Sequence, residues 1–281
     1  KNSSSKSILI KSILSVLVIA TVFVACSQKG FTQTQSKNKS TFVLVHGAFL
    51  GAWSWEKVKD KLENLGHKVV SVDLPSHGND QTNIKDITMK SYIDAVSKVI
   101  NLEDEKVILV GHSFGGVTIS QVAEYMPKKI KGLVYVSALL LANNQSLLDS
   151  TKDGPKSLAF QHLFFSKDHS YVSVKEEFLH EGFAKDLSYS DFLIQKKKFV
   201  VEPTKPFSYK LQISEEKWGS IDRFYVETLK DNAVLPTFQK SMYTKATVNK
   251  VYSLNSDHLP MFSKVDKLTS YLDDVSKQLN Q

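Results

Sequence analysis

Apolar and polar residues alternate along this chain with two periods, one typical of buried strands and the other typical of helices. Thr41–Val45 is a short, β-branched apolar run closed by a His-Gly pair, as expected of a buried parallel strand. Segment 52–65 carries Trp55, Val58 and Leu62 at helical spacing and ends at a glycine. Further strands are predicted at 68–72, 106–110, 131–137, 223–228 and 250–254, and further helices at 89–100, at about 117–126 and from 264. This alternation predicts an α/β fold on a mostly parallel, doubly wound sheet.

The alternation stops between about residues 139 and 221. Charged, amphipathic pieces and two prolines, Pro203 and Pro206, replace it, and the strand pattern returns only at 223. An insertion after the middle strands of such a sheet lies over the carboxyl ends of the strands, where α/β proteins bind ligands. We therefore expect a helical cap at about 139–221 above a ligand site.

The first 40 residues have the composition of an export signal followed by a linker. Three lysines precede an apolar run at 12–25, which is shorter than the ~20 residues that span a bilayer, and Cys26 follows it. Phe23–Cys26 resembles a bacterial lipobox, with Phe23 in place of the usual aliphatic residue. We expect a signal peptide at 1–25, a flexible tether at 26–40 and a folded domain at 41–281. We also expect a lipid anchor on Cys26, which would hold the exported protein to a membrane of the bacterial cell envelope. A signal peptide cut elsewhere and an uncleaved anchor are the alternatives.

Composition and charge exclude several classes of protein. The 281 residues are 42% hydrophobic and 23% charged with one cysteine, which excludes disordered, collagen-like and disulfide-scaffold proteins. The net charge of +7 is mild, and the basic residues are lysines spread along the chain, with Arg223 as the single arginine. Nucleic-acid recognition relies on arginine and on a concentrated basic patch, so we expect no nucleic-acid partner.

Gly111–Gly115 fits the pattern G-x-S-x-G, with an apolar strand before it and a helix after it. In this context the pattern predicts a sharp turn that lifts the Ser113 hydroxyl above the sheet at a helix N-terminus, where backbone amides favour developing negative charge. Side chains at Gly111 and Gly115 would clash with neighbouring elements. Ser113 is therefore the predicted nucleophile.

A serine nucleophile needs a base, and the base needs an orienting acid. In this fold the chain order is Ser, acid, His, and His258 is the histidine that follows a predicted strand after Ser113. Asp231 follows the strand at 223–228 by a short loop, so we expect it to be the acid. Asp257 is adjacent to the histidine and Asp222 lies at the wrong end of the strand, which makes both poorer candidates.

An oxyanion hole in such a site needs two backbone amides. One comes from the residue after the serine, Phe114, and the other from the loop after the first strand, where we choose Ala48. Candidate pocket walls, for which an ordinary core role is the alternative, are Leu50, Trp53, Phe114, Leu139 and Leu259.

Five blocks of this chain then carry a family resemblance. They are His46–Trp53, Gly66–Val69, Val107–Gly116, Leu235–Gln239 and Asp257–Leu259. Together they resemble the plant methylesterase and hydroxynitrile lyase family of α/β hydrolases and its bacterial esterase relatives, from about residue 41 to the C-terminus. The resemblance implies the α/β-hydrolase fold, a triad of Ser113, Asp231 and His258, and an oxyanion hole at Ala48 and Phe114.

The two branches of that family differ in chemistry. Lyases characteristically have Thr where this chain has Ala48 and Lys where it has Leu259. The expected function is therefore hydrolysis of small-molecule carboxylic esters through an acyl-enzyme, without a metal or organic cofactor. A hydroxynitrile lyase-like activity and a non-catalytic ligand-binding lipoprotein are the alternatives. The sequence leaves the natural substrate and the oligomeric state open.

Overall fold

A computed structural model describes residues 39–152 and 157–281, so the predicted signal peptide, Cys26 and most of the predicted tether lie outside the described residues. At its centre is one six-stranded sheet, in which every strand pairs with its neighbours in parallel. In spatial order the strands are β2 (Lys68–Val72), β1 (Thr41–Val45), β3 (Val107–His112), β4 (Ile130–Val136), β8 (Arg223–Thr228) and β9 (Lys250–Leu254). The predicted α/β fold with a parallel sheet is confirmed.

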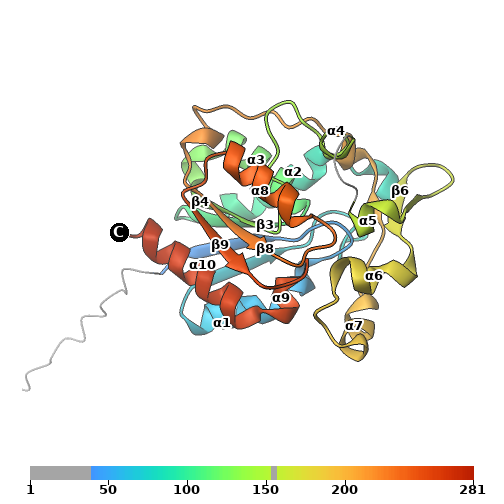
Figure 1. Cartoon of the computed structure of the whole chain (residues 1–281). Coiled ribbons are helices and arrows are strands. Elements are labelled where there is room, and N and C mark those ends of the chain that lie inside the picture. The colour runs from blue at the N-terminus through green and yellow to red at the C-terminus, as the bar shows by residue number, and fades with distance from the viewer. Residues whose placement is uncertain (1–38, 153–156) are drawn as a thin grey trace, which may run out of the picture. The chain divides into compact units, whose positions relative to one another are not determined.

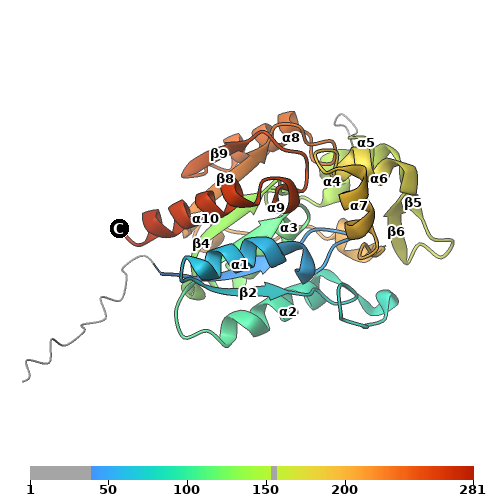
Figure 2. The same cartoon turned by 90° about the horizontal axis from the view of Figure 1, so that it is seen from below.

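Helices cover both faces of this sheet (Figure 1). On one face α1 (Glu56–Asn64) packs against α10 (Val265–Leu279), and on the other α2 (Met89–Asn101) packs against α3 (Gly115–Tyr125), while α8 (Pro236–Lys245) packs on β8. Figure 2 shows α1 and α10 from their own side, lying along the strands. Because both faces are covered, the middle strand β3 is buried along its whole length, which explains its continuous apolar sequence.

The predicted element boundaries are close to the observed ones. The helix expected at 52–65 begins as a 3₁₀ turn, η1 (Ala52–Trp55), before α1. Strand β3 runs on to His112, so the first glycine of the elbow pattern is still a strand residue. The remaining short helices outside segment 139–221 are η2 (Ile84–Asp86), η3 (Pro127–Lys129) and α9 (Pro260–Ser263).

Segment 139–221 is not purely helical, which corrects one part of the expected cap. Its helices are α4 (Leu147–Thr151), α5 (Leu158–Gln161), α6 (Glu176–Phe183), α7 (Tyr189–Lys196), η4 (Lys205–Ser208) and η5 (Trp218–Ser220). It also contains an antiparallel sheet of β5 (Leu163–Phe165), β6 (Tyr171–Val174) and β7 (Glu202–Pro203). These strands have two to four residues each, which is too short for an alternating pattern to reveal them.

Hydrogen bonds tie this segment to the loops that follow the carboxyl ends of β1 and β9. The Val200 amide donates to the Phe49 carbonyl at 3.0 Å, and the Asp186 amide donates to the Asp257 carboxylate at 2.8 Å. The segment therefore adjoins the edge of the sheet at which Ser113 lies. Within residues 39–152 and 157–281, none of the helices has both the length and the apolar character needed to cross a bilayer.

Candidate active site

Ser113 occupies a strained turn between β3 and α3. Its φ of +52° lies in the left-handed region, which a residue with a side chain adopts at a cost of order 1–3 kcal/mol. Neighbouring chain leaves no room for a side chain at Gly115, where a Cβ would lie 2.6 Å from the His46 carbonyl oxygen. The turn can form because the sequence puts glycine at that position, and it leaves the Ser113 side chain only half buried.

His258 lies in the loop after β9, with its imidazole directed at Ser113. The distance from His258 Nε2 to Ser113 Oγ is 2.9 Å. Beneath it, His112 Nε2–H donates to the His258 carbonyl oxygen at 2.9 Å, and the two rings are 4.7 Å apart. Burial and the neighbouring His258 hold the pKa of His112 well below its usual value, so His112 supports the loop as a neutral ring.

Asp231 holds the other side of the His258 ring, at 2.7 Å between Oδ2 and Nδ1. The carboxylate is 1% exposed, and four further donors bind it. These are the amides of Ala233 and Val234 on Oδ1, and Thr228 Oγ1 and Gln239 Nε2 on Oδ2. These donors fix the position of the carboxylate, and Oδ2 is placed to accept the Nδ1–H of His258. The opposite nitrogen, Nε2, is then an acceptor for the Ser113 hydroxyl proton.

The two other acids considered from the sequence point elsewhere. Asp257 accepts hydrogen bonds from the amides of Asp186 and Leu259, and burial raises the pKa of its carboxyl group. Asp222 precedes β8 and accepts from the side chain of Asn249 at 2.8 Å. Of the three acids, Asp231 is the one that the structure brings to His258.

The two predicted oxyanion donors border the same space. Ala48 and Phe114 both line a cavity next to Ser113, and the loop before Ala48 touches the serine so closely that a Cβ at Gly47 would lie 2.6 Å from that of Ser113. Neither the Ala48 amide nor the Phe114 amide has a hydrogen-bond partner among the residues that the structure describes. Two free amides beside a nucleophile are a suitable arrangement for an oxyanion.

The cavity at Ser113 is narrow and apolar, with a volume of about 40 Å³. Segment 139–221 supplies most of its wall: Leu139, Leu147, Ala159, Phe160, Leu163, Phe183 and Phe207. Ala233 and Val234, which also hold Asp231, close it from the β8 side. An acyl or alcohol group in this cavity would contact hydrocarbon on all these sides.

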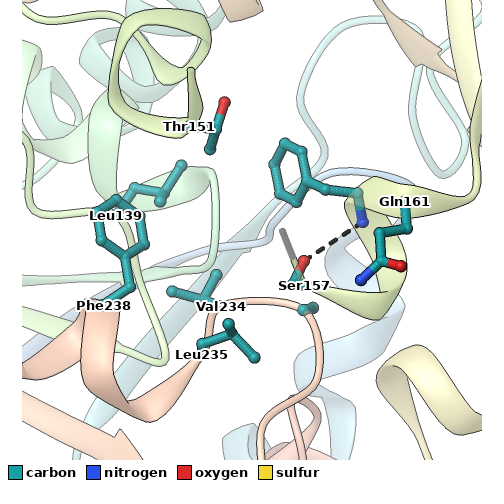
Figure 3. A pocket seen from close by; sticks show the side chains of 9 residues that line it. Leu139, Thr151, Ser157, Gln161, Val234, Leu235 and Phe238 are labelled. Carbon is teal, nitrogen blue, oxygen red and sulfur yellow. Dashed lines mark hydrogen bonds between the residues drawn. The ribbon is translucent and has the colours of Figure 1, made fainter. Parts of the chain in front are cut away.

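A second cavity of about 350 Å³ shares four of these residues, Leu139, Phe160, Ala233 and Val234. Figure 3 shows its two sides, with Leu139 and Phe238 facing Ser157 and Gln161 of the α5 region. Ser157 caps α5 by accepting from the Phe160 amide at 3.3 Å. The second cavity therefore adds polar groups beyond the apolar one.

The predicted pocket walls are distributed over different places. Leu139 and Phe114 line the cavity at Ser113. Trp53 stacks on Phe262, at 5.8 Å between ring centroids, and lines a separate surface hollow. Leu50 and Leu259 are 2% and 1% exposed, and in the described part of the chain neither lines the cavity at Ser113.

Sequence reasoning missed the residues that segment 139–221 brings to the site. Phe183 of α6 packs on His258 at 5.6 Å between ring centroids, and Glu202 of β7 accepts from the Phe49 amide at 3.1 Å, one residue after Ala48. These residues follow no motif, and their distance from Ser113 along the chain carries no signal. The only local feature of Glu202 in the sequence is that it directly precedes Pro203, and this feature does not predict its contact with Phe49.

The fold and this elbow define an α/β hydrolase. The model of the "Alpha/beta hydrolase family" matches residues 42–269, and the chain belongs to that family. Within the family it belongs with the plant methylesterases and hydroxynitrile lyases, as the resemblance implied.

Relatives and solved structures agree with this placement. Methylesterase 7 of Arabidopsis thaliana is 32% identical over 85% of this chain and 97% of its own length. Alpha-hydroxynitrile lyase of the same plant is 32% identical over 85% and 98%. The crystal structure of polyneuridine aldehyde esterase is 29% identical, with a TM-score of 0.77 over 85% of this chain and 99% of that one. The chain spans 56 to 64% of the length of three chloroplastic relatives.

Proposed function

We propose that this protein is a serine esterase that hydrolyses carboxylic esters of small molecules through Ser113, His258 and Asp231. The observation that carries the proposal is the chain of two hydrogen bonds, 2.9 Å from Ser113 to His258 and 2.7 Å from His258 to Asp231. Similarity to a methylesterase and to an esterase structure supports the same reaction.

In the proposed reaction Ser113 Oγ attacks the ester carbonyl carbon while its proton passes to His258 Nε2. The carbonyl oxygen becomes an oxyanion that accepts from the Ala48 and Phe114 amides, and Asp231 stabilises the imidazolium. The intermediate collapses as His258 returns the proton to the leaving alcohol, which leaves an acyl group on Ser113. Water, deprotonated by His258, then releases the acid and regenerates the serine.

The test is to treat the whole protein with a fluorophosphonate probe, map the labelled residue by mass spectrometry, and assay p-nitrophenyl and methyl esters. Labelling at Ser113 and loss of both labelling and turnover in Ser113→Ala are expected. Ser71→Ala is the control serine, because the Ser71 hydroxyl has no hydrogen-bond partner in the described part of the chain. Full esterase turnover in Ser113→Ala would exclude the proposal, and ligand binding without labelling would favour the non-catalytic alternative.

A hydroxynitrile lyase-like activity is the alternative enzyme function. One relative bears that name, and the resemblance places Thr and Lys of the lyases at Ala48 and Leu259. The lining of the cavity at Ser113, as far as the structure describes it, contains no lysine that could stabilise departing cyanide. We expect mandelonitrile to release no cyanide above the uncatalysed rate in a colorimetric assay.

We also propose that the protein is exported and tethered to a membrane of the bacterial cell envelope by lipid on Cys26. The support is the sequence pattern of lysines, a short apolar run and a cysteine at its end. Labelled fatty acid supplied to bacterial cells is expected to appear in the wild-type protein and to be absent from Cys26→Ala. Equal labelling of the two proteins would contradict the anchor.

A further inference from the structure

We propose that Glu202, contributed by β7 outside the main sheet, is a positioning residue for the oxyanion hole because it holds the loop that presents the Ala48 amide. The inference rests on the proposed esterase reaction. It assigns Glu202 no contact with the reacting atoms, and its role is to fix a donor that touches them.

The first step is the set of groups that Glu202 joins. Its side chain is buried, with the residue 1% exposed, and its carboxylate accepts three hydrogen bonds. Tyr92 Oη–H donates to Oε1 at 2.8 Å, while His77 Nε2–H at 2.8 Å and the Phe49 amide at 3.1 Å both donate to Oε2. One acid therefore links α2, the loop after β2 and the loop after β1.

The second step concerns Phe49, the residue after Ala48. Its φ of +68° is in the left-handed region, which a residue with a large side chain occupies only when its surroundings hold it there. Those surroundings are two hydrogen bonds to segment 200–202, from the Phe49 amide to Glu202 and from the Val200 amide to the Phe49 carbonyl at 3.0 Å. The Phe49 amide belongs to the peptide that joins it to Ala48, so Glu202 fixes that peptide directly.

The third step is the peptide on the other side of Ala48. His46 Nδ1–H donates to the Gly47 carbonyl at 2.8 Å, and His46 Nε2 accepts from the Leu74 amide at 3.0 Å. Burial and the neighbouring His77 lower the pKa of His46 to about 3, so this tautomer persists at neutral pH. In a trans peptide the N–H points away from the C=O. Holding the Gly47 carbonyl on His46 therefore turns the Ala48 N–H away from His46.

Both peptides that flank Ala48 are thus held, one by a neutral histidine of its own loop and one by an acid from β7. The Ala48 amide has no hydrogen-bond partner of its own in the described residues. Before the oxyanion forms, its position therefore depends on the two flanking peptides. An oxyanion donor stabilises the transition state when it is fixed in advance. Glu202 fixes one of the two peptides that position this donor.

A second buried glutamate provides a matched control. Glu124 of α3 accepts from the Ser214 amide at 2.8 Å, the Ser214 hydroxyl at 2.9 Å and the Trp218 amide at 3.3 Å. It therefore also ties segment 139–221 to the main domain with three hydrogen bonds, but its partners lie away from the loop of Ala48. Loss of Glu124 removes a comparable anchor without touching the oxyanion loop.

The experiment compares Glu202→Gln, Glu202→Asp and Glu202→Leu with Glu124→Leu in the full chain. Final labelling by the fluorophosphonate counts active sites, and kcat is expressed per site. Two competitive inhibitors are then measured, a trifluoromethyl ketone and the carboxylic acid product. The ketone accepts Ser113 Oγ on its carbonyl carbon, its oxygen becomes an oxyanion and the serine proton passes to His258, so its affinity reports on the oxyanion hole.

Glu202→Leu is expected to lower kcat per site by about 10- to 100-fold, which is less than the roughly 10²- to 10³-fold cost of losing an oxyanion donor, because the Ala48 amide is displaced and not removed. The affinity for the ketone should fall by the same factor, and the affinity for the product should be unchanged. Glu202→Asp withdraws the carboxylate by one methylene and should fall between Glu202→Leu and wild type. Glu202→Gln keeps an oxygen for Phe49 and should retain most of the activity. Glu124→Leu should lower stability and leave kcat per site unchanged.

Equal kcat per site in Glu202→Asp and Glu202→Gln would overturn the inference, and this comparison stands even where Glu202→Leu does not fold. An equal loss of affinity for the ketone and for the product would also overturn the inference, because that result would indicate a general disturbance of the site. Failure of the proposed function looks different. In that case wild type itself shows no turnover that depends on Ser113, whereas failure of this inference leaves a wild-type esterase that is indifferent to residue 202.

Discussion

Two histidine–carboxylate pairs of this molecule have both partners buried, and they differ in one hydrogen bond. His258 donates from Nδ1 to Asp231 at 2.7 Å, and His77 donates from Nε2 to Glu202 at 2.8 Å. The second nitrogen of His258 faces the hydroxyl of Ser113, from which it can accept. The second nitrogen of His77 faces the carbonyl oxygen of Pro75 at 3.1 Å, which accepts only.

That difference separates the proposed base, His258, from a structural cation, His77. With carbonyl and carboxylate oxygens on its two sides, His77 donates from both nitrogens and has no lone pair left to take a proton. Burial lowers the pKa of His77, but the charge and hydrogen bond of Glu202 outweigh it, so the pKa is raised overall. His258 has a carboxylate on one side only and keeps a lone pair for Ser113. A histidine–carboxylate pair is therefore not in itself a sign of catalysis.

The largest effect that separates the two pairs is expected from removing each imidazole. His258→Ala should lower kcat by at least about 10⁴-fold, since losing the base of such a triad removes most of its catalysis. His77→Gln should lower kcat far less, because residue 77 touches the oxyanion loop only from behind, through Glu202 and the ring of His46. The measurement is kcat on a p-nitrophenyl ester per mole of folded protein, because a serine without its base is not labelled efficiently by the fluorophosphonate. Losses of the same size in both variants would contradict the distinction.

The next effect concerns the acid of the first pair. Asp231→Asn should lower kcat by about 10³- to 10⁴-fold through the wrong tautomer of His258. The amides of Ala233 and Val234 require an oxygen at the Oδ1 position, so the new NH₂ group would face His258 Nδ1. His258 would then carry its proton on Nε2 and could not accept one from Ser113. Unchanged turnover in Asp231→Asn would move the acid to another residue.

The fold was predictable because its signals are local. Strands β1 and β3 are nearly continuous apolar runs, and helices such as α2 and α10 have one apolar face, so periodicity places these elements to within a few residues. The elbow was equally predictable, because a sharp strand-to-helix turn requires glycines at fixed offsets from Ser113. Chain order within the fold then indicated Asp231 and His258, which the structure brings together.

The second pair was not predictable in the same way. His77 and Glu202 are 125 residues apart, and neither belongs to a motif that specifies the other. His77 lies in a turn-rich loop after the second strand, and Glu202 lies in the segment without a regular pattern. Tertiary contacts between a turn and a two-residue strand leave no periodic trace, so only the structure could join them.

The third effect is on stability and tests whether the second pair is a buried ion pair. His77→Leu should lower the free energy of unfolding by about 3 to 5 kcal/mol, because it leaves the buried Glu202 carboxylate without its cation. Adding Glu202→Leu should restore part of that loss, since an apolar pair of similar volume avoids the unpaired charge. Urea denaturation of wild type, His77→Leu, Glu202→Leu and the double variant gives the coupling free energy between residues 77 and 202. Strictly additive losses would show that the two side chains do not act as a pair.

The smallest effect is the pH dependence of that stability, and its sign follows from the raised pKa of His77. The folded protein binds this proton more tightly than the unfolded chain, so the contribution of His77 is complete below its ordinary pKa of 6.5 and is lost as pH rises through the raised value. Subtracting the stability of His77→Gln from that of wild type at each pH cancels most of the titration of the other nearby groups. The difference should shrink from pH 6 to pH 9. His46, whose pKa is lowered to about 3, acts with the opposite sign and below pH 6.5, so it cannot produce this trend. A difference that grew with pH would mean that His77 is buried neutral, and the contrast with His258 would then have to rest on geometry alone.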